Sequence, residues 1–351
     1  MNPGRSLMLV SARADAALRR EVREGLRPRP EYLALEADHH VELLDWSMLP
    51  GGRQGRRGFG SALHVAVALR TLRSYDAILS DGEHVGIPLA LGMLTFGISR
   101  PHLVIGHRLS TSSKVPLLRD LRAHRAMSRI LVHSPRQLDF AMNDLRIPAH
   151  KVAFVPYHAD ADFWHPLGLP EEALIVAAGR EHRDYATLAA ATAGLPARVF
   201  VAAGSLHSPR AVNREPATWP SNWTHRFARY AELRDLYARA SVVVVPVVAT
   251  DFQAGVTTVL EAMAMGKVVI TSDAGAQGGV VRHNETGILV RHGDAAELRE
   301  AIADLLAHPR TRERLGEAAR HEVLRTYHVD TYAARLAGQL AEVALPAGAA
   351  A

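Results

Sequence analysis

A strand, a loop, a helix and a second strand follow one another in residues 242–271, which read VVVVPVVATDFQAGVTTVLEAMAMGKVVIT. The apolar runs 242–246 and 267–271 predict buried parallel strands, with a helix at 259–265 between them. A strand–helix–strand unit of this kind is typical of a parallel sheet with helices on both faces. The loop before the helix contains Gly255, so backbone N–H groups and the positive end of the helix dipole face outward there and suit a phosphate.

The same alternation extends along most of the chain. Strands are predicted at 6–12, 76–80, 103–105, 130–132, 152–155, 173–178 and 198–203, and helices at 61–72, 85–96, 115–127, 135–145, 185–193 and 328–343. The rhythm stops at 156–170, which is rich in Pro and predicts a linker. We therefore expect an α/β protein of two doubly wound parallel-sheet domains. Ligands of such sheets bind at the carboxyl ends of the strands, so we expect the site in a central cleft that both domains face.

The composition narrows the class of protein. The 351 residues include no Cys, which excludes a disulfide scaffold, a cysteine nucleophile and a thiolate metal site. The net charge of +5 fits a protein that handles anionic ligands, and it is too small to indicate nucleic-acid binding. The longest apolar run, 85–99, is shorter than the roughly 20 residues that cross a bilayer, so we expect a cytoplasmic protein with at most peripheral membrane contact. His spacings typical of zinc sites are missing, and we expect no metal.

Three side chains at the helix start carry possible chemistry. Thr257 and Thr258 offer hydroxyl donors, and Glu261 offers a carboxylate that can accept from both hydroxyls of a ribose. The alternative remains open, because Thr258 and Glu261 are also spaced as a capping box, which needs no ligand.

Two Arg residues follow the predicted strand 173–178. Arg180 and Arg183 precede a helix at a strand end, where two guanidinium groups can clamp a pyrophosphate through bidentate hydrogen bonds. The alternative is a surface ion pair with Glu181 or Asp184.

Three windows together resemble a known family. Residues 257–269 read TTVLEAMAMGKVV, residues 285–290 read ETGILV, and residues 293–298 read GDAAEL. This part of the chain resembles the C-terminal half of the GT-B glycosyltransferases of family 4. The likeness is specific over residues 150–330 and only topological over residues 1–150.

The resemblance implies a retaining transfer of a sugar from a nucleotide diphosphate sugar, most commonly a UDP-sugar, to an acceptor hydroxyl, without a metal or other cofactor. The acceptor hydroxyl attacks the anomeric carbon on the face from which the diphosphate departs, and a leaving-group oxygen takes its proton. The protein stabilises the charge that grows on the diphosphate. The resemblance assigns catalysis to Arg180, Arg183 and His107, and donor binding to Gln253, Ala254, Gly255, Val256, Thr257, Thr258 and Glu261.

Some of these assignments depart from the family or leave alternatives. The family usually carries two Glu separated by seven residues; Glu261 is the second, and the neutral Gln253 stands near the first, with Asp251 as a partial substitute. Gly279 follows Gly278 where relatives often place an acid. His107 matches a cleft His that touches the donor sugar, and a buried structural His is the alternative.

The resemblance also divides the chain. It implies an acceptor-binding Rossmann-like domain at 1–158 and a nucleotide-sugar-binding Rossmann-like domain at 159–326. The C-terminal helix in 327–351 is expected to pack back toward the N-terminal domain and to end in a frayed tail. Glu83 and His84 follow a strand and are candidates for the acceptor side, with a loop cap by Asp81 as the alternative.

Competing functions stay open on the sequence alone. The same architecture serves phosphorylases and sugar epimerases, and the neutral Gln253 is compatible with a non-catalytic nucleotide-sugar-binding protein. The basic loop 50–60 could form a surface for an anionic acceptor, nucleic acid or membrane, but a solvated loop is the favoured interpretation. The acceptor, the sugar, the base and the oligomeric state are not specified by the sequence.

Overall fold

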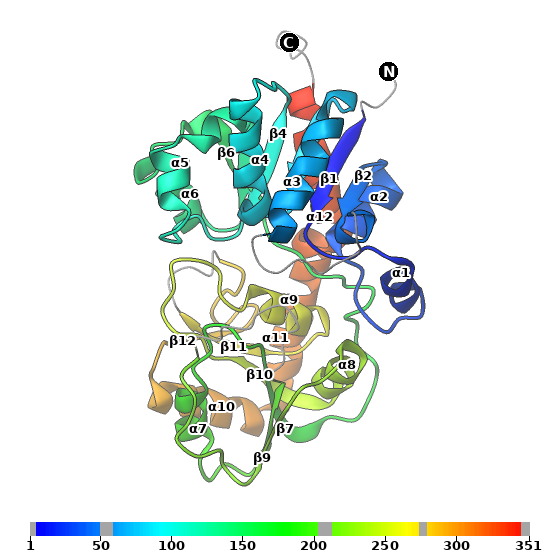
Figure 1. Cartoon of the computed structure of the whole chain (residues 1–351). Coiled ribbons are helices and arrows are strands. Elements are labelled where there is room, and N and C mark those ends of the chain that lie inside the picture. Colours follow the sequence, from blue (N-terminus) through cyan, green and yellow to red (C-terminus); the bar gives the residue numbers. More distant parts are fainter. Residues whose placement is uncertain (1–4, 50–58, 203–212, 274–278, 345–351) are drawn as a thin grey trace. The chain divides into compact units, whose positions relative to one another are not determined.

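The computed structural model describes residues 5–49, 59–202, 213–273 and 279–344 (Figure 1). The chain divides into two compact units. Unit 1 comprises residues 1–23, 29–156 and 330–351, and unit 2 comprises residues 24–28 and 157–329. Each unit contains one six-stranded sheet in which all neighbouring strands are parallel.

The strands and helices of unit 1 alternate along the chain. They are β1 (Ser6–Val10), α1 (Ala16–Arg23), α2 (Glu31–His39), β2 (Glu42–Asp45), α3 (Phe59–Thr71), β3 (Ala77–Ser80), α4 (Glu83–Thr95), β4 (His102–Gly106), α5 (Val115–Arg119), β5 (Arg129–Val132), α6 (Pro135–Asn143), β6 (Val152–Phe154) and α12 (Val329–Ala344). The strand order is β2-β1-β3-β4-β5-β6. The order reverses between β1 and β3, which is the switch point of this sheet.

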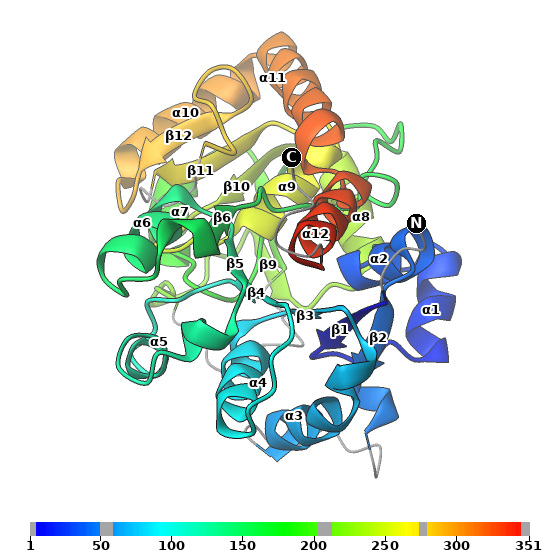
Figure 2. The ribbon, with the colours of Figure 1, turned by 90° about the horizontal axis from the view of Figure 1, so that it is seen from above.

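Helices cover both faces of the first sheet. Alternate strand residues such as Leu7 and Leu9 pack with α3 and α4 on one face. Figure 2 shows α3 and α4 on one side of these strands and α2 and α12 on the other. Arg129 of β5 donates to the side chains of Gln339 and Glu342 on α12, at 2.6 and 2.5 Å, so the last helix of the chain is part of unit 1.

Unit 2 repeats the alternation. Its elements are β7 (Glu172–Ala178), α7 (Tyr185–Thr192), β8 (Arg198–Ala202), β9 (Trp223–Arg226), α8 (Tyr230–Arg239), β10 (Ala240–Val245), α9 (Val256–Ala264), β11 (Val269–Asp273), β12 (Ile288–Arg291), α10 (Ala295–Ala307) and α11 (Pro309–Glu322). The strand order is β12-β11-β10-β7-β8-β9. The two strands at the centre, β7 and β10, flank the switch point, as in the Rossmann arrangement.

The predicted linker at 156–170 contains the boundary between the two units, at Pro156, and part of it also packs in the core of unit 2. Trp164 is 1% exposed and packs edge-on against Phe163 and Tyr230 in the cluster that also holds α8 and α9. The segment has no regular period because it is extended and irregular, but its aromatic side chains fill the core. A Pro-rich pattern indicates an irregular backbone, but it does not predict which side chains are buried.

Several predicted boundaries shift for local reasons. The helix predicted at 115–127 is α5 followed by a 3-10 turn (Ala123–Ala126), because Arg122 adopts a left-handed φ of 52° that ends the α-helix. The strand predicted at 267–271 begins only at Val269, since the Lys267 N–H still bonds to the turn that ends α9. The strands β2, β9 and β12 and the helices α1, α2 and α8 were not predicted. Each of these strands is only four residues long, and β9 consists mostly of exposed polar residues.

Some expectations fall on residues outside the described ranges. These are most of the basic loop, residues 50–58, the tail 345–351 and Gly278. Within the described part of the chain, none of the helices has the length and apolar character needed to cross a membrane.

Candidate functional site

The switch point of unit 2 brings two loops together at the carboxyl ends of β7 and β10. The Asp184 N–H donates to the Pro246 carbonyl at 2.9 Å, and the Val248 N–H donates to the His182 carbonyl at 3.0 Å. The loop after β7 and the loop after β10 are therefore fixed beside each other. In an open α/β sheet this is where a ligand is expected.

The loop after β10 leads into α9 through a single glycine. Gly255 is the N-cap residue in the left-handed conformation, with φ 81° and no side-chain cap on the helix. A Cβ at this position would lie 2.8 Å from Val245 Cγ1, so a side chain is disfavoured both by φ and by space. The helix starts at Val256, three residues before the predicted start. Its first N–H groups have no carbonyl partner within the helix and point toward the switch point.

The early start of α9 shows that the capping-box alternative is wrong. Thr258 and Glu261 lie inside the helix, at its third and sixth residues, so neither can cap it. Thr257 is exposed at the helix start, whereas Thr258 is buried. The hydroxyl of Thr258 accepts a hydrogen bond from Arg183 Nη2 at 3.2 Å.

Arg183 is a buried cation held by this site. Its side chain is 4% exposed, and its Nε and Nη1 donate to the Ala178 and Glu181 carbonyls at 2.8 and 2.6 Å. With the bond to Thr258, three of the five guanidinium N–H groups have acceptors among the described residues. Burial lowers the pKa of Arg183, and nearby groups including Glu261 oppose that effect. The group is thus a buried positive charge fixed by three hydrogen bonds.

Glu261 is the carboxylate of the same site. It is 7% exposed, and burial raises its pKa to about 8, against the opposing charge of Arg183. Two phenols on α8 face it: burial raises the pKa of both Tyr230 and Tyr237, and the charge of Glu261 adds to each rise. These Tyr residues were missed by the sequence reasoning, since only the packing of α8 against α9 brings them near Glu261.

The remaining candidates in unit 2 surround this pair. Arg180 is exposed in the loop after β7 and makes no ion pair among the described residues, so the expected pair with Glu181 or Asp184 is not observed. Asp184 instead caps α7 through the Thr187 N–H and pairs with Arg214 at 3.0 Å. In the loop before Gly255, Gln253 is partly exposed and Ala254 is buried.

The third predicted catalytic residue, His107, lies in unit 1. It follows β4 and is exposed, so the alternative of a buried structural His is wrong. Its Nε2 lies 2.9 Å from the Asp81 carbonyl, and its ring centroid lies 5.5 Å from that of His133. Glu83 is buried, accepts from the Arg108 N–H at 2.6 Å and pairs with Lys114 at 3.2 Å, so it anchors the loop after β4.

Comparison with known proteins agrees with the arrangement of unit 2. The sequence model of the family described as glycosyl transferases group 1 matches residues 221–322. The alpha-maltose-1-phosphate synthases of two Mycobacterium tuberculosis strains are 34% identical over 111 residues, which is 30% of this chain. The matched stretch spans 28% of the length of these curated relatives.

Solved structures resemble the chain over nearly its whole length. Sucrose-phosphate synthase from Thermosynechococcus elongatus is 20% identical with a TM-score of 0.71, covering 96% of this chain and 98% of that one. HepE of Anabaena, in complex with UDP and glucose, is 17% identical with a TM-score of 0.69, covering 96% and 99%. The fold is GT-B. The GT-B expectation from the sequence is confirmed, with one Rossmann-like sheet in each unit.

One group of possible metal ligands occurs among the described residues of this GT-B chain. Asp160, Asp162 and His328 place one ligand atom each within 4.8 Å of one another. Asp160 already accepts from the N–H groups of Asp162 and Phe163, at 3.1 and 3.3 Å, and Asp162 is mostly exposed. The group therefore has a local structural explanation as a turn with an ion pair.

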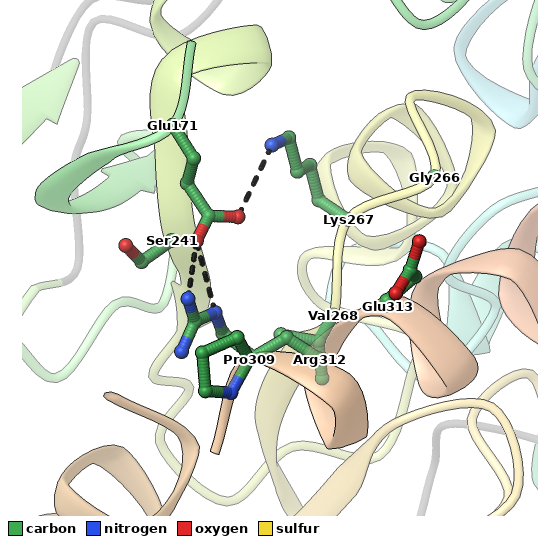
Figure 3. A pocket seen from close by; sticks show the side chains of 8 residues that line it. All are labelled: Glu171, Ser241, Gly266, Lys267, Val268, Pro309, Arg312 and Glu313. Atoms are coloured by element: carbon green, nitrogen blue, oxygen red, sulfur yellow. Dashed lines mark hydrogen bonds and ion pairs between the residues drawn. The ribbon is translucent and has the colours of Figure 1, made fainter. Parts of the chain in front are cut away.

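A cavity of about 370 Å³ lies at the opposite, amino edge of the second GT-B sheet. Figure 3 shows the Glu171 carboxylate between the Lys267 ammonium and the Arg312 guanidinium. Glu171 directly precedes β7, and Lys267 directly follows the turn that ends α9. Burial lowers the pKa of Lys267, and Glu171 opposes that effect. This ion triad ties the C-terminal end of α9 to the sheet, at the end of the helix opposite its N-cap Gly255.

Proposed function

We propose that the chain is a retaining glycosyltransferase that moves a sugar from a nucleotide diphosphate sugar, a UDP-sugar, to an acceptor hydroxyl without a metal. The observation that carries the proposal is the grouping of Arg183, the free start of α9 and Glu261 at the switch point of unit 2. A fixed cation, a helix N-terminus and a buried carboxylate are the three groups that a nucleoside diphosphate needs.

In this proposal the diphosphate lies against the N–H groups of Val256 and Thr257. Arg183 supplies a preorganised positive charge, because its side chain is already held by Ala178, Glu181 and Thr258 before any ligand arrives. The exposed Arg180 closes on the other side of the diphosphate. Glu261 accepts hydrogen bonds from the ribose hydroxyls, and Gln253 and Ala254 line the sugar.

The reaction follows from stabilising the leaving group. The bond between the anomeric carbon and the diphosphate oxygen breaks while the acceptor oxygen bonds to the same face of the carbon. The acceptor proton passes to a leaving-group oxygen, so no protein nucleophile is required. His107 at the carboxyl edge of unit 1 contacts the donor sugar, and unit 1 binds the acceptor. Support for a uridine nucleotide comes from HepE, whose structures hold UDP or UDP-glucose.

The experiment is a melting-temperature screen with UDP, GDP and ADP and with their glucose conjugates, each with and without EDTA. A ligand at 100 times its Kd stabilises the folded chain by about 2.7 kcal/mol, which shifts the melting temperature by a measurable few degrees. We expect the shift with UDP and UDP-sugars, unchanged by EDTA and reduced in Arg180→Ala. Glu300→Gln, an exposed carboxylate on α10, is the matched control.

Measurements of turnover distinguish the proposed glycosyltransferase from a phosphorylase and from a binding protein. Release of UDP with retention at the anomeric carbon, followed by NMR of the product, supports the proposal. Turnover that depends on inorganic phosphate would identify a phosphorylase, and a melting shift without turnover on any acceptor would identify a binding protein. Absence of a shift with every nucleotide contradicts the site itself.

A further inference from the structure

The amino edge of the first sheet carries exposed apolar side chains. All six strands of this sheet are parallel, so the segments that directly precede them lie at one edge. Helix α4 ends at this edge, where Gly97 adopts a left-handed φ of 61°. Phe96, in the turn that ends α4, is 67% exposed, and Leu121, in the segment before β5, is 59% exposed. Both side chains therefore present apolar surface to solvent at the same edge of the sheet.

The segments that carry these two side chains pack against each other. Helix α4 contacts the 3-10 turn (Ala123–Ala126) that follows Leu121. Ala126 packs against the apolar cluster that contains Met93 of α4. The Lys151 ammonium donates to two carbonyls of the turn at 3.2 and 3.3 Å. The exposed apolar groups are thus attached to segments that packing and hydrogen bonds hold in place.

Exposed Arg residues share this edge. They precede three strands that are neighbours in the sheet, β3, β4 and β5, and they are Arg73, Arg100, Arg122 and Arg125. None of the four pairs with a carboxylate within the described part of the chain. Two carboxylates close to them in sequence have other partners: Asp76 accepts from the Arg5 N–H at 2.8 Å, and Asp120 pairs with Arg119 at 2.9 Å.

The charges of these Arg residues act on a neighbouring group. Burial lowers the pKa of His124, and positive charges nearby, including those of Arg125 and Arg122, add to that effect. Exposed guanidinium groups without carboxylate partners produce a positive potential at the surface. This edge of unit 1 therefore combines positive charge with exposed apolar surface.

We propose that this amino edge of unit 1 docks on a membrane surface that contains anionic lipid. The four Arg residues attract the anionic headgroups, and Phe96 and Leu121 insert between them. These groups precede neighbouring strands, so they lie along one edge and meet an extended surface together. Nucleic acid is a weaker match, because its interfaces are polar and give the two apolar side chains no partner. His107 follows β4 at the opposite, carboxyl edge, which this docking leaves uncovered.

Sedimentation of the whole chain with lipid vesicles tests the docking. The probes are vesicles of phosphatidylcholine alone and of phosphatidylcholine with about 30% phosphatidylglycerol, at low salt and at about 0.5 M NaCl. We expect binding to the anionic vesicles only. We expect the higher salt to weaken that binding about tenfold, since it screens the attraction between the Arg residues and the headgroups.

Two variants assign the binding to this edge. Each Arg close to an anionic surface raises the affinity about fivefold, so Arg73→Gln/Arg125→Gln should weaken vesicle binding about 25-fold. Phe96→Ser should weaken it about tenfold, because an inserted aromatic ring is lost. The matched control, Arg136→Gln/Arg310→Gln, removes the same charge from exposed residues of α6 and α11 and should bind like the unmodified chain. All three variants should keep the melting temperature, since the replaced side chains are exposed.

Four results overturn the docking: no binding to anionic vesicles, equal binding to neutral and anionic vesicles, equal binding by Arg73→Gln/Arg125→Gln and its control, or unchanged binding by Phe96→Ser. A duplex DNA probe is tested in parallel. If DNA binds the unmodified chain, vesicles do not, and Arg73→Gln/Arg125→Gln loses the DNA, the edge is assigned to nucleic acid and the docking is also overturned. The docking does not depend on sugar transfer, so absence of a melting shift with every nucleotide overturns the proposed function alone.

Discussion

Replacing Glu261 by Gln should change how the stability of unit 2 depends on pH. Glu261 is 7% exposed on α9, and burial raises the pKa of its carboxyl group to about 8 from an ordinary value of 4.5. Between these two values the folded chain keeps the proton and the unfolded chain has lost it. The free energy of unfolding of the unmodified chain therefore falls as the pH rises through this window.

The size of the effect follows from the width of the window. From about pH 5 to about pH 7.5 is roughly 2.5 pH units, and full titration would contribute about 1.4 kcal/mol for each unit. Because the group is only partly titrated near each end of this window, the loss is about 3 kcal/mol. Gln has nearly the shape of a protonated Glu and cannot ionise. We therefore expect Glu261→Gln to escape this loss and to be more stable than the unmodified chain by about 3 kcal/mol more at pH 7.5 than at pH 5.

Urea unfolding followed by tryptophan fluorescence reports mainly on unit 2, which contains Glu261. Three of the four Trp residues, Trp164, Trp219 and Trp223, lie in unit 2. The matched control is Glu300→Gln, which removes an exposed carboxyl group from α10 and should follow the unmodified chain at every pH. If Glu261→Gln also follows the unmodified chain, Glu261 is ionised in the folded protein, and the buried, protonated carboxyl group inferred here does not exist.

Four further substitutions test the geometry of the same site. Arg180→Ala should keep the urea midpoint and weaken UDP binding about tenfold. Arg183→Ala should lower the free energy of unfolding by about 3 kcal/mol, because the buried acceptors of Arg183 lose a charged donor. Equal midpoints for the two variants would contradict the burial of Arg183. Gly255→Ala should destabilise the chain by roughly 1–3 kcal/mol, because φ is 81° and the new Cβ lies 2.8 Å from Val245 Cγ1. An unchanged melting temperature would argue against Gly255 as the N-cap of α9 in this conformation. The hydroxyl of Tyr237 is buried without a hydrogen-bond partner among the described residues. Tyr237→Phe should therefore leave the free energy of unfolding in urea unchanged or raise it by up to about 1 kcal/mol. A clear fall in that free energy would reveal a partner of the hydroxyl.

The burial of Arg183 changes the effect that is expected when this residue is replaced by Ala. From the sequence, removing this guanidinium is a change in ligand binding alone. In the structure the same group bonds two backbone carbonyls and a hydroxyl, so the substitution also removes contacts that hold the loop after β7. Stability and UDP affinity must therefore be measured together for this residue, and Arg180 is the variant that separates the two.

Local pattern alone was enough to predict the strand–helix rhythm, the two sheets and the helix that follows Gly255. These features depend on residues a few positions apart, since side chains alternate in a strand and repeat about every fourth residue in a helix. The same reasoning failed where the signal was weak or irregular. It missed the exposed edge strand β9, and it did not predict that the linker segment buries Trp164 in the core of unit 2.

Only the tertiary structure decided which groups surround the candidate residues. Arg183 and Thr258 are 75 positions apart and become hydrogen-bond partners because the strand order places β7 beside β10. Ser11 and Asp81 are 70 positions apart and become hydrogen-bond partners because β1 lies beside β3. The sequence lists which chemical groups are available, but their partners, burial and charge state depend on which strands are neighbours, and residues distant in the chain become neighbours only when the sheet forms.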